Sequence, residues 1–136
     1  MSKIDREATQ VPTDFWHQVS DQAWDEAAAL VADEFEGFFP QTGEKVSGAA
    51  SFINLLRRML GSAQIEIHNR MASYDVWDKT HEVALQIRVE SPGNETGKLG
   101  KSQFVLAFFT VDRDYLISGA SIYFAACGEP HDGRTY

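Results

Sequence analysis

The residues of this chain that could carry out chemistry match known active-site patterns only in part. The segment 97–102 ends like a phosphate-binding loop, but Glu95 stands where that loop requires a glycine. His81 and Glu82 begin like the helix of a zinc protease, but Leu85 occupies the position of the second histidine ligand. The sequence therefore predicts neither nucleotide binding nor a metal site, and it implies no cofactor.

Serine and cysteine nucleophiles are not indicated either. Ser121 follows Gly119 and Ala120, but the second glycine of a nucleophile elbow is absent. Cys127 is the only cysteine, which excludes an intrachain disulfide and favours an inert thiol. A chain with a single cysteine fits a reducing compartment, so we expect a cytoplasmic protein.

Length and charge narrow the possible functions further. The chain has 136 residues, which suits one domain, and 43% of them are hydrophobic, which is enough to fill a core. Its 20 Asp and Glu exceed its 12 Lys and Arg, and the net charge of -8 opposes binding to nucleic acid or to an anionic membrane. The sequence also has neither a signal-peptide pattern nor a run of roughly 20 apolar residues that could span a membrane. We expect no nucleic-acid or membrane partner.

The first half of the chain is dominated by helical spacing of apolar residues. Residues 1–12 show no periodic pattern, which predicts a flexible N-terminal tail, and Thr13 or Asp14 is expected to cap the first helix. The expected elements that follow are helices over 13–20, 24–31 and 52–60, a short strand over 35–39 and a loop over 41–48. Pro40 is expected to end the strand, and Gly61 to end the third helix.

The second half consists of β-forming runs. They cover residues 64–77, 81–91, 99–112 and 115–126. Residues 112–114 connect the last two runs closely enough for an antiparallel hairpin. The sequence predicts an α+β fold in which three N-terminal helices pack on a curved, mostly antiparallel sheet. We expect one domain over 13–127, followed by a C-terminal tail over 128–136.

The last two strands are apolar on both sides. Gln103, Val105, Ala107, Phe109, Val111, Ala120, Ile122 and Phe124 alternate with Phe104, Leu106, Phe108, Ile117 and Tyr123. A sheet covered by helices on one face only would show polar residues on the other face. The second apolar face therefore predicts burial against a second copy, so we expect a homodimer through the sheet. The alternative is that curvature of the sheet or the polar tails cover this face.

In this order, the elements resemble the nuclear transport factor 2-like superfamily, which includes SnoaL-like polyketide cyclases, ketosteroid isomerase, scytalone dehydratase and limonene epoxide hydrolase. The resemblance spans about 14–126. It rests on residues 24–35 before a strand that ends at Pro40, on Gly48 before the third helix, and on the last strand with 121–124. It implies a cone-shaped fold with a pocket between the helices and the concave sheet face, and a convex face that often forms dimers.

The family layout also implies which side chains line the cone. They are Phe15, Trp16, Phe39, Phe52, Leu56, Gln103, Val105, Ala107, Phe109, Ile122 and Phe124. A lining this apolar suits a small hydrophobic or aromatic molecule that is held by area burial, with few orienting polar groups. Gln103 is the one polar side chain among them and would orient the ligand.

Catalytic roles can be carried over only where the residues match. The base and the two hydrogen-bond donors of ketosteroid isomerase correspond here to Phe39, Phe15 and Ala107, which excludes that isomerisation. A lyase, isomerase or hydrolase without cofactor would have to use Asp33, or His68, as its base. His68 alternates with core-facing residues and is expected to point away from the cone.

Three interpretations stay open from the sequence. The chain could be a homodimeric binder of a hydrophobic molecule, a cofactor-independent enzyme that acts on such a molecule, or an interaction module whose cone is filled by its own side chains. The volume of the cone cavity separates the third interpretation from the first two.

Overall fold

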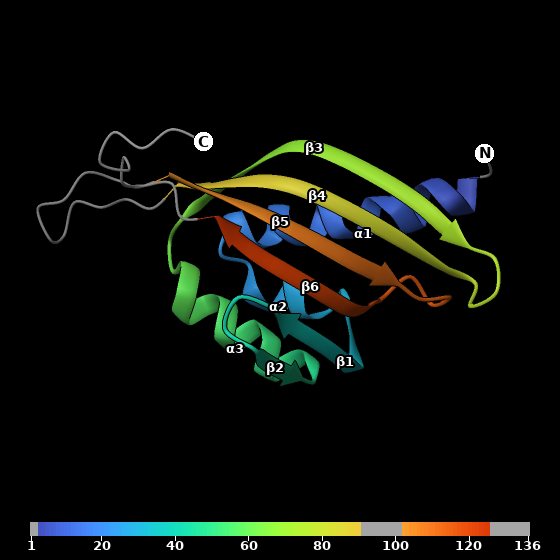
Figure 1. Ribbon diagram of the computed structural model, residues 1–136, viewed down its shortest axis with the longest axis horizontal. Helices are drawn as coiled ribbons and strands as arrows, with labels where there is room; N and C mark the ends of the chain where they lie inside the picture. The colour runs from blue at the N-terminus through green and yellow to red at the C-terminus, as the bar shows by residue number, and fades with distance from the viewer. Residues whose placement is uncertain (1–2, 91–101, 126–136) are drawn as a thin grey trace, which may run out of the picture.

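The chain folds into one curved sheet with helices on its inner side (Figure 1). The computed structural model describes residues 3–90 and 102–125. The helices are α1 (Lys3–Ser20), α2 (Trp24–Ala28) and α3 (Ala49–Leu60). The strands are β1 (Val31–Phe39), β2 (Glu44–Ser47), β3 (Gln64–Asp75), β4 (Thr80–Glu90), β5 (Ser102–Val111) and β6 (Ile117–Ala125). Their order in the sheet is β2-β1-β6-β5-β4-β3, and only the β1–β6 pair is parallel. The predicted α+β class with a curved, mostly antiparallel sheet is confirmed, although β1 and β2 lie between the helices in the chain.

Helix α1 is longer than its sequence pattern predicts. The predicted tail is wrong for residues 3–12, because α1 begins at Lys3 and continues through Pro12. Ala8 and Val11 are buried, with 0% and 8% of their surfaces exposed, so this part of the helix packs into the core. Proline costs one helical hydrogen bond, but burial of an apolar helix face outweighs that loss.

The segment between α1 and α3 also differs from its prediction. The predicted helix up to Val31 is wrong, because α2 ends at Ala28 and Val31 already begins β1. Val31 pairs with Ile117 of the distant β6, and this long-range pairing overrides the local helical spacing. The expected loop over 41–48 contains β2, which pairs with β1. The end of β1 directly before Pro40 is as predicted.

The remaining elements agree with the sequence. Helix α3 begins after Gly48 and ends before Gly61, and both glycines have positive φ angles, of 91° and 55°. Strands β3, β5 and β6 lie within their predicted runs, β4 begins one residue before its run, and β5 and β6 form an antiparallel hairpin pair. The tail over 128–136 and Cys127 lie outside the described residues. None of the described helices is long and apolar enough to cross a membrane.

Strand β5 alternates between the two faces of the sheet as predicted. Val105, Ala107, Phe109 and Val111 are buried on the inner face, while Phe104, Leu106 and Phe108 are 37%, 42% and 42% exposed on the outer face. One placement on β6 is wrong. Ile117 was expected beside Tyr123 on the outer face, but it is fully buried. In the pairing of β5 with β6, Thr110 pairs with Gly119 but Val111 pairs with Ile117. This shift in register turns the side chain of Ile117 to the inner face.

Candidate functional site

The inner face of the sheet and the three helices enclose the cone, and its predicted lining forms the core of the protein. Phe15, Trp16, Phe39, Phe52, Leu56, Val105, Ala107, Phe109 and Ile122 are all buried, and none exposes more than 4% of its surface. Gln103 and Phe124 are half-buried. The structure therefore gathers the predicted lining residues on the inner side of the sheet.

The aromatic rings at the centre of the cone pack on one another. The ring of Phe52 stacks on Phe35 at a centroid distance of 4.3 Å and on Phe15 at 5.7 Å. The ring of Phe109 meets both Phe15 and Trp16 edge-on at 5.9 Å. Phe35 is part of this cluster although the family layout did not predict it; its place in an apolar run before Pro40 was the only sequence signal.

The centre of the cone is filled in this conformation. The side chains of Phe15, Phe52 and Phe109 are 0% exposed, and Trp16 is 1% exposed. A cavity wide enough for one water molecule would expose the residues that form its walls. No such space borders these four side chains, so a ligand could enter the centre of the cone only if they moved.

Two polar atoms in the same region lack partners. Trp16 Nε1 and Thr13 Oγ1, both on α1, are buried and have no hydrogen-bond partner within the described part of the chain. Buried polar side-chain atoms are hydrogen-bonded in the large majority of cases. Sequence reasoning missed this pair, because the packing of α1 against the sheet is needed to bury it.

The predicted bases lie away from the filled centre. Asp33 is exposed on β1, and His68 is exposed on β3. The ring of His68 meets Phe104 edge-on at 5.7 Å, and this contact places it on the outer face, as its alternation predicted. Among the described residues, His81 is the one buried ionisable side chain. A catalytic role for Asp33 or His68 stays a prediction, and for His68 it requires a substrate bound outside the cone.

His68 belongs to a charged cluster at one end of the outer face. Its Nε2 lies 2.8 Å from Glu66 Oε1, and Arg88 donates to Glu90 Oε2 at 2.7 Å. Arg88 Nη1 is also 3.8 Å from Glu66 Oε1. The hydrogen bond with His68, then its charge, lowers the pKa of the Glu66 carboxyl. The described residues contain no group of three His, Cys, Asp or Glu side chains that could hold a metal ion.

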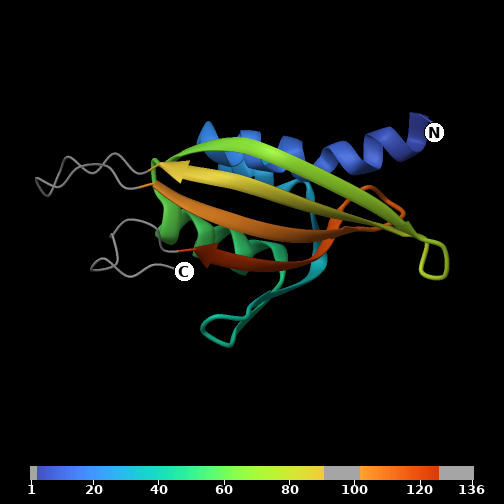
Figure 2. The same cartoon turned by 45° about the horizontal axis from the view of Figure 1, so that its top comes forward.

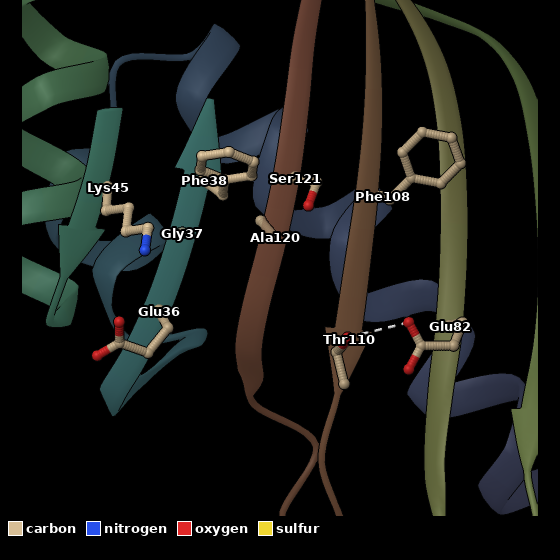
Figure 3. A pocket seen from close by; sticks show the side chains of 9 residues that line it. All are labelled: Glu36, Gly37, Phe38, Lys45, Glu82, Phe108, Thr110, Ala120 and Ser121. Atoms are coloured by element: carbon tan, nitrogen blue, oxygen red, sulfur yellow. Dashed lines mark hydrogen bonds between the residues drawn. The ribbon is translucent and has the colours of Figure 1, made fainter. Parts of the chain in front are cut away.

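One hollow lies on the outer face of the sheet, outside the cone. It has a volume of about 410 Å³ and is lined by Glu36, Gly37, Phe38, Lys45, Glu82, Phe108, Thr110, Ala120 and Ser121 (Figure 3). Phe38 and Phe108 flank it from β1 and β5. At one end, Thr110 Oγ1 donates to Glu82 Oε1 at 2.9 Å. Sequence reasoning did not predict this hollow, because it depends on strands that are distant in the chain.

A second hollow adjoins the first across Phe108. It has a volume of about 310 Å³ and is lined by Met71, Ala72, Ser73, Glu82, Val83, Ala84 and Phe108. Around the two hollows, large apolar side chains remain exposed, which we call the outer apolar patch. It consists of Phe38, Phe104, Leu106, Phe108 and Tyr123, which are between 37% and 42% exposed. None of the described helices covers this side of β4, β5 and β6 (Figures 1 and 2).

The fold is similar to solved structures over almost the whole chain. A ketosteroid isomerase-like protein of Kribbella flavida has a TM-score of 0.74 and 19% identity, over 95% of this chain and 85% of its own. A nuclear transport factor 2-like protein of unknown function from Burkholderia xenovorans has a TM-score of 0.76 and 12% identity, over 96% and 92%. The orange carotenoid protein of Anabaena, in a structure that binds canthaxanthin, has a TM-score of 0.71 and 13% identity, over 90% of this chain and 36% of its own. No family model and no curated protein matches the sequence.

Identities this low establish a shared fold and carry no shared activity. The resemblance inferred from the sequence is confirmed by the order of the elements and by the structural neighbours. The chain has the nuclear transport factor 2-like cone fold that SnoaL-like proteins share.

Proposed function

We propose that the protein acts as a homodimer whose two copies pack their outer sheet faces together. The observation that supports this proposal is the outer apolar patch, whose members lie on three neighbouring strands, β1, β6 and β5. Leu106 on β5 pairs with Tyr123 on β6. Ser121 on β6 pairs with Phe108 on one side and with Phe38 of β1 on the other. Monomeric proteins rarely expose contiguous apolar surface of this kind unless it is used for binding.

The charges around the patch favour the same interpretation. Glu36 and Lys45 lie at the side of β1 and β2, and Glu66 and Arg88 lie at the side of β3 and β4. An apolar centre within a polar rim is the usual anatomy of a specific protein interface. Two sheets of this kind pack face to face about 10 Å apart with interdigitated side chains. The hollows beside Phe108 would receive side chains of the partner.

The proposal can be tested by sedimentation equilibrium of the wild type and two matched variants. Leu106 on the patch is 42% exposed, and Met59 on α3 is 45% exposed away from it, so the two are equally accessible. We expect the wild type and Met59→Lys to be dimers at micromolar concentration and Leu106→Lys to be a folded monomer by circular dichroism. A monomeric wild type, or a Leu106→Lys variant that dimerises like the wild type, would disprove this interface.

A second candidate function is the binding of a small hydrophobic molecule in the cone, without cofactor. The observation that favours it is a pair of buried atoms, Trp16 Nε1 and Thr13 Oγ1, that have no hydrogen-bond partner among residues 3–90 and 102–125. The orange carotenoid protein, one of the structural neighbours, binds the hydrophobic molecule canthaxanthin. Binding would require the central rings to separate, and burial of the ligand would compensate for the packing that they lose.

Thermal unfolding with a panel of aromatic and terpenoid compounds tests this second function. A ligand that binds only the folded state adds about 2.7 kcal/mol of stability when its concentration is about 100 times the dissociation constant. We expect at least one compound class to raise the melting temperature in proportion to its concentration. A panel that leaves the melting temperature unchanged would leave the dimer as the remaining function.

A further inference from the structure

We propose that a two-fold axis running across the strands relates the two copies, so that the partner's Tyr123 fills the outer hollow beside Ser121. In the same arrangement, the partner's Arg88 meets Glu82 at the edge of that hollow. The inference rests on the proposed homodimer through the outer apolar patch. It goes further because it names the side chains that each copy inserts into the other.

The acidic residues of the outer face disfavour an axis that runs along the strands. Two copies packed face to face need a two-fold axis between their sheets, parallel to the sheet planes. If this axis ran along the strands between β5 and β6, it would place β4 over the partner's β1. Glu36, Gly119, Thr110 and Glu82 form one row across the sheet, so Glu82 would then face the partner's Glu36. Like charges that face each other oppose association.

An axis across the strands brings opposite charges together instead. Exposed and buried side chains alternate along β4, and Glu82 and Arg88 lie on its outer side, three residues to either side of Leu85. Leu85 pairs with Ala107 of β5. An axis over this row places each Glu82 opposite the partner's Arg88, and symmetry makes this contact twice. An axis one residue further along β4 would place Glu82 opposite the partner's Glu90, which is again a like charge.

The same axis brings a large side chain opposite a small one. Leu106 pairs with Tyr123, and Phe108 pairs with Ser121 in the next outward-facing row. The axis exchanges these two rows, so Tyr123 lies over the partner's Ser121. The small side chain of Ser121 lies between Phe38 and Phe108, where the hollow of about 410 Å³ opens (Figure 3). A tyrosine ring there would contact both phenylalanine rings, and such aromatic contacts stabilise an interface beyond the area that they bury.

The charged side chains can meet without breaking their contacts within the chain. Glu82 Oε1 accepts from Thr110, and Arg88 donates to Glu90 Oε2 at 2.7 Å. A carboxylate accepts several hydrogen bonds, and a guanidinium has five N–H donors. Both residues lie about 10 Å from the axis along β4, and a crossing angle of about 30° between packed sheets displaces them sideways by about 5 Å. The long side chain of arginine can span this displacement.

Two charge-reversed chains test the arrangement by complementation. Glu82→Lys alone would face the partner's Arg88 in both contacts, and Arg88→Glu alone would face the partner's Glu82. We expect each variant alone to raise the dissociation constant of the dimer at least about tenfold in sedimentation equilibrium. In a mixture, both contacts of the mixed dimer join opposite charges, so its dissociation constant should return to within about threefold of the wild type.

The mixture also removes effects that arise within one chain. Arg88→Glu loses the hydrogen bond to Glu90 whether it is alone or mixed, so only a contact between copies can explain a recovery. One chain carries heavy-isotope nitrogen, which lets native mass spectrometry distinguish the mixed dimer from the two homodimers. Asp78→Lys is the matched control, because it makes the same change of charge at an exposed position in the turn between β3 and β4. It should dimerise like the wild type and should not rescue Arg88→Glu.

A second pair of variants tests the hollow by size. Ser121→Tyr would place two tyrosines opposite each other, so we expect it to weaken the dimer. Tyr123→Ser leaves the hollow empty and should weaken the dimer as well. A mixture of the two chains again places one tyrosine opposite one serine in each contact, and we expect it to dimerise more tightly than either variant alone. If a charge variant is unfolded by circular dichroism, this pair decides the question.

The outcomes separate the inference from the function on which it rests. A monomeric wild type would remove both the homodimer and the proposed axis. If the wild type is a dimer but the mixtures are no tighter than the single variants, the dimer stands and the axis is wrong. Variants that dimerise as tightly as the wild type would also overturn the axis, because the altered side chains would then lie outside the interface.

Discussion

Replacing Phe52 by alanine tests whether the cone is filled. Phe52 is 0% exposed on α3, and its ring stacks on Phe35 and Phe15 at 4.3 Å and 5.7 Å. Removing a phenylalanine ring from a packed core costs about 3 to 5 kcal/mol, because the loss of burial is joined by the cost of the cavity that remains. A ring that lined an open pocket would have packing on one side only, and its loss would cost about 1.5 kcal/mol.

The two values correspond to clearly different melting temperatures. For 136 residues, an unfolding entropy of about 2.1 cal/mol/K per residue amounts to about 0.29 kcal/mol/K. A packed ring therefore predicts a fall of about 10 to 17 °C for Phe52→Ala, and a pocket-lining ring predicts a fall of about 5 °C. Urea unfolding provides the free energy, and calorimetry provides the melting temperature.

Met59→Ala is the control for this experiment. Met59 lies on the same helix and is 45% exposed, so the change to alanine alters helix propensity while it removes little packing. We expect it to change the free energy of unfolding by less than about 1 kcal/mol. A cost near 1.5 kcal/mol for Phe52→Ala would refute the argument that side chains fill the centre of the cone.

Three further predictions concern other parts of the molecule. Gly37→Ala should destabilise the fold by about 1 to 3 kcal/mol in urea unfolding, because an added Cβ would lie 2.7 Å from Phe35 Cε2. An unchanged urea midpoint would show that the Phe35 ring can move aside without cost. His68→Phe should raise the pKa of Glu66 toward its ordinary value in a nuclear magnetic resonance titration, because the lowered pKa depends first on the hydrogen bond with His68, which phenylalanine cannot make. A carboxyl whose pKa is lowered by folding stabilises the fold above its unfolded-state pKa, and this stabilisation is lost as the pH falls through the folded-state pKa. The variant should therefore be less sensitive to acid, and identical Glu66 titrations would contradict the pairing. Trp77→Ala should change the free energy of unfolding by less than about 0.5 kcal/mol, because Trp77 is 93% exposed at the turn between β3 and β4. A large loss of folding stability would mean that its ring has a structural role.

Much of the fold was predictable because its signals are local. Helix α3 has apolar residues at helical spacing between two glycines, Gly48 and Gly61, and its observed bounds follow these signals. Strand β5 alternates in period two, and each side chain lies on the predicted face of the sheet. The apolar outer face was predictable for the same reason. The spacing of apolar residues and the signals that begin and end a helix depend only on residues close together in the chain. A single sequence is therefore enough to find them.

The errors arose where distant contacts decide the outcome. Val31 enters β1 because it pairs with Ile117, which lies far along the chain. The first part of α1 persists through Pro12 because Ala8 and Val11 bury against the sheet. Local propensity cannot reveal either contact, since both depend on segments that meet only after folding.

The sequence by itself determined the fold class, the strands β3 to β6 and the two-sided apolar sheet, while the resemblance to the family implied which residues gather in the cone. Only the tertiary structure decided that the rings of Phe15, Phe52 and Phe109 fill the cone and that a hollow forms on the outer face beside Phe108. It also decided that Trp16 Nε1 has no partner within the part of the chain that the structure describes. The physical reason is that residue types and periodicity fix which side of an element is apolar. Whether the apolar sides close on one another or leave a cavity depends on how their shapes fit together in three dimensions.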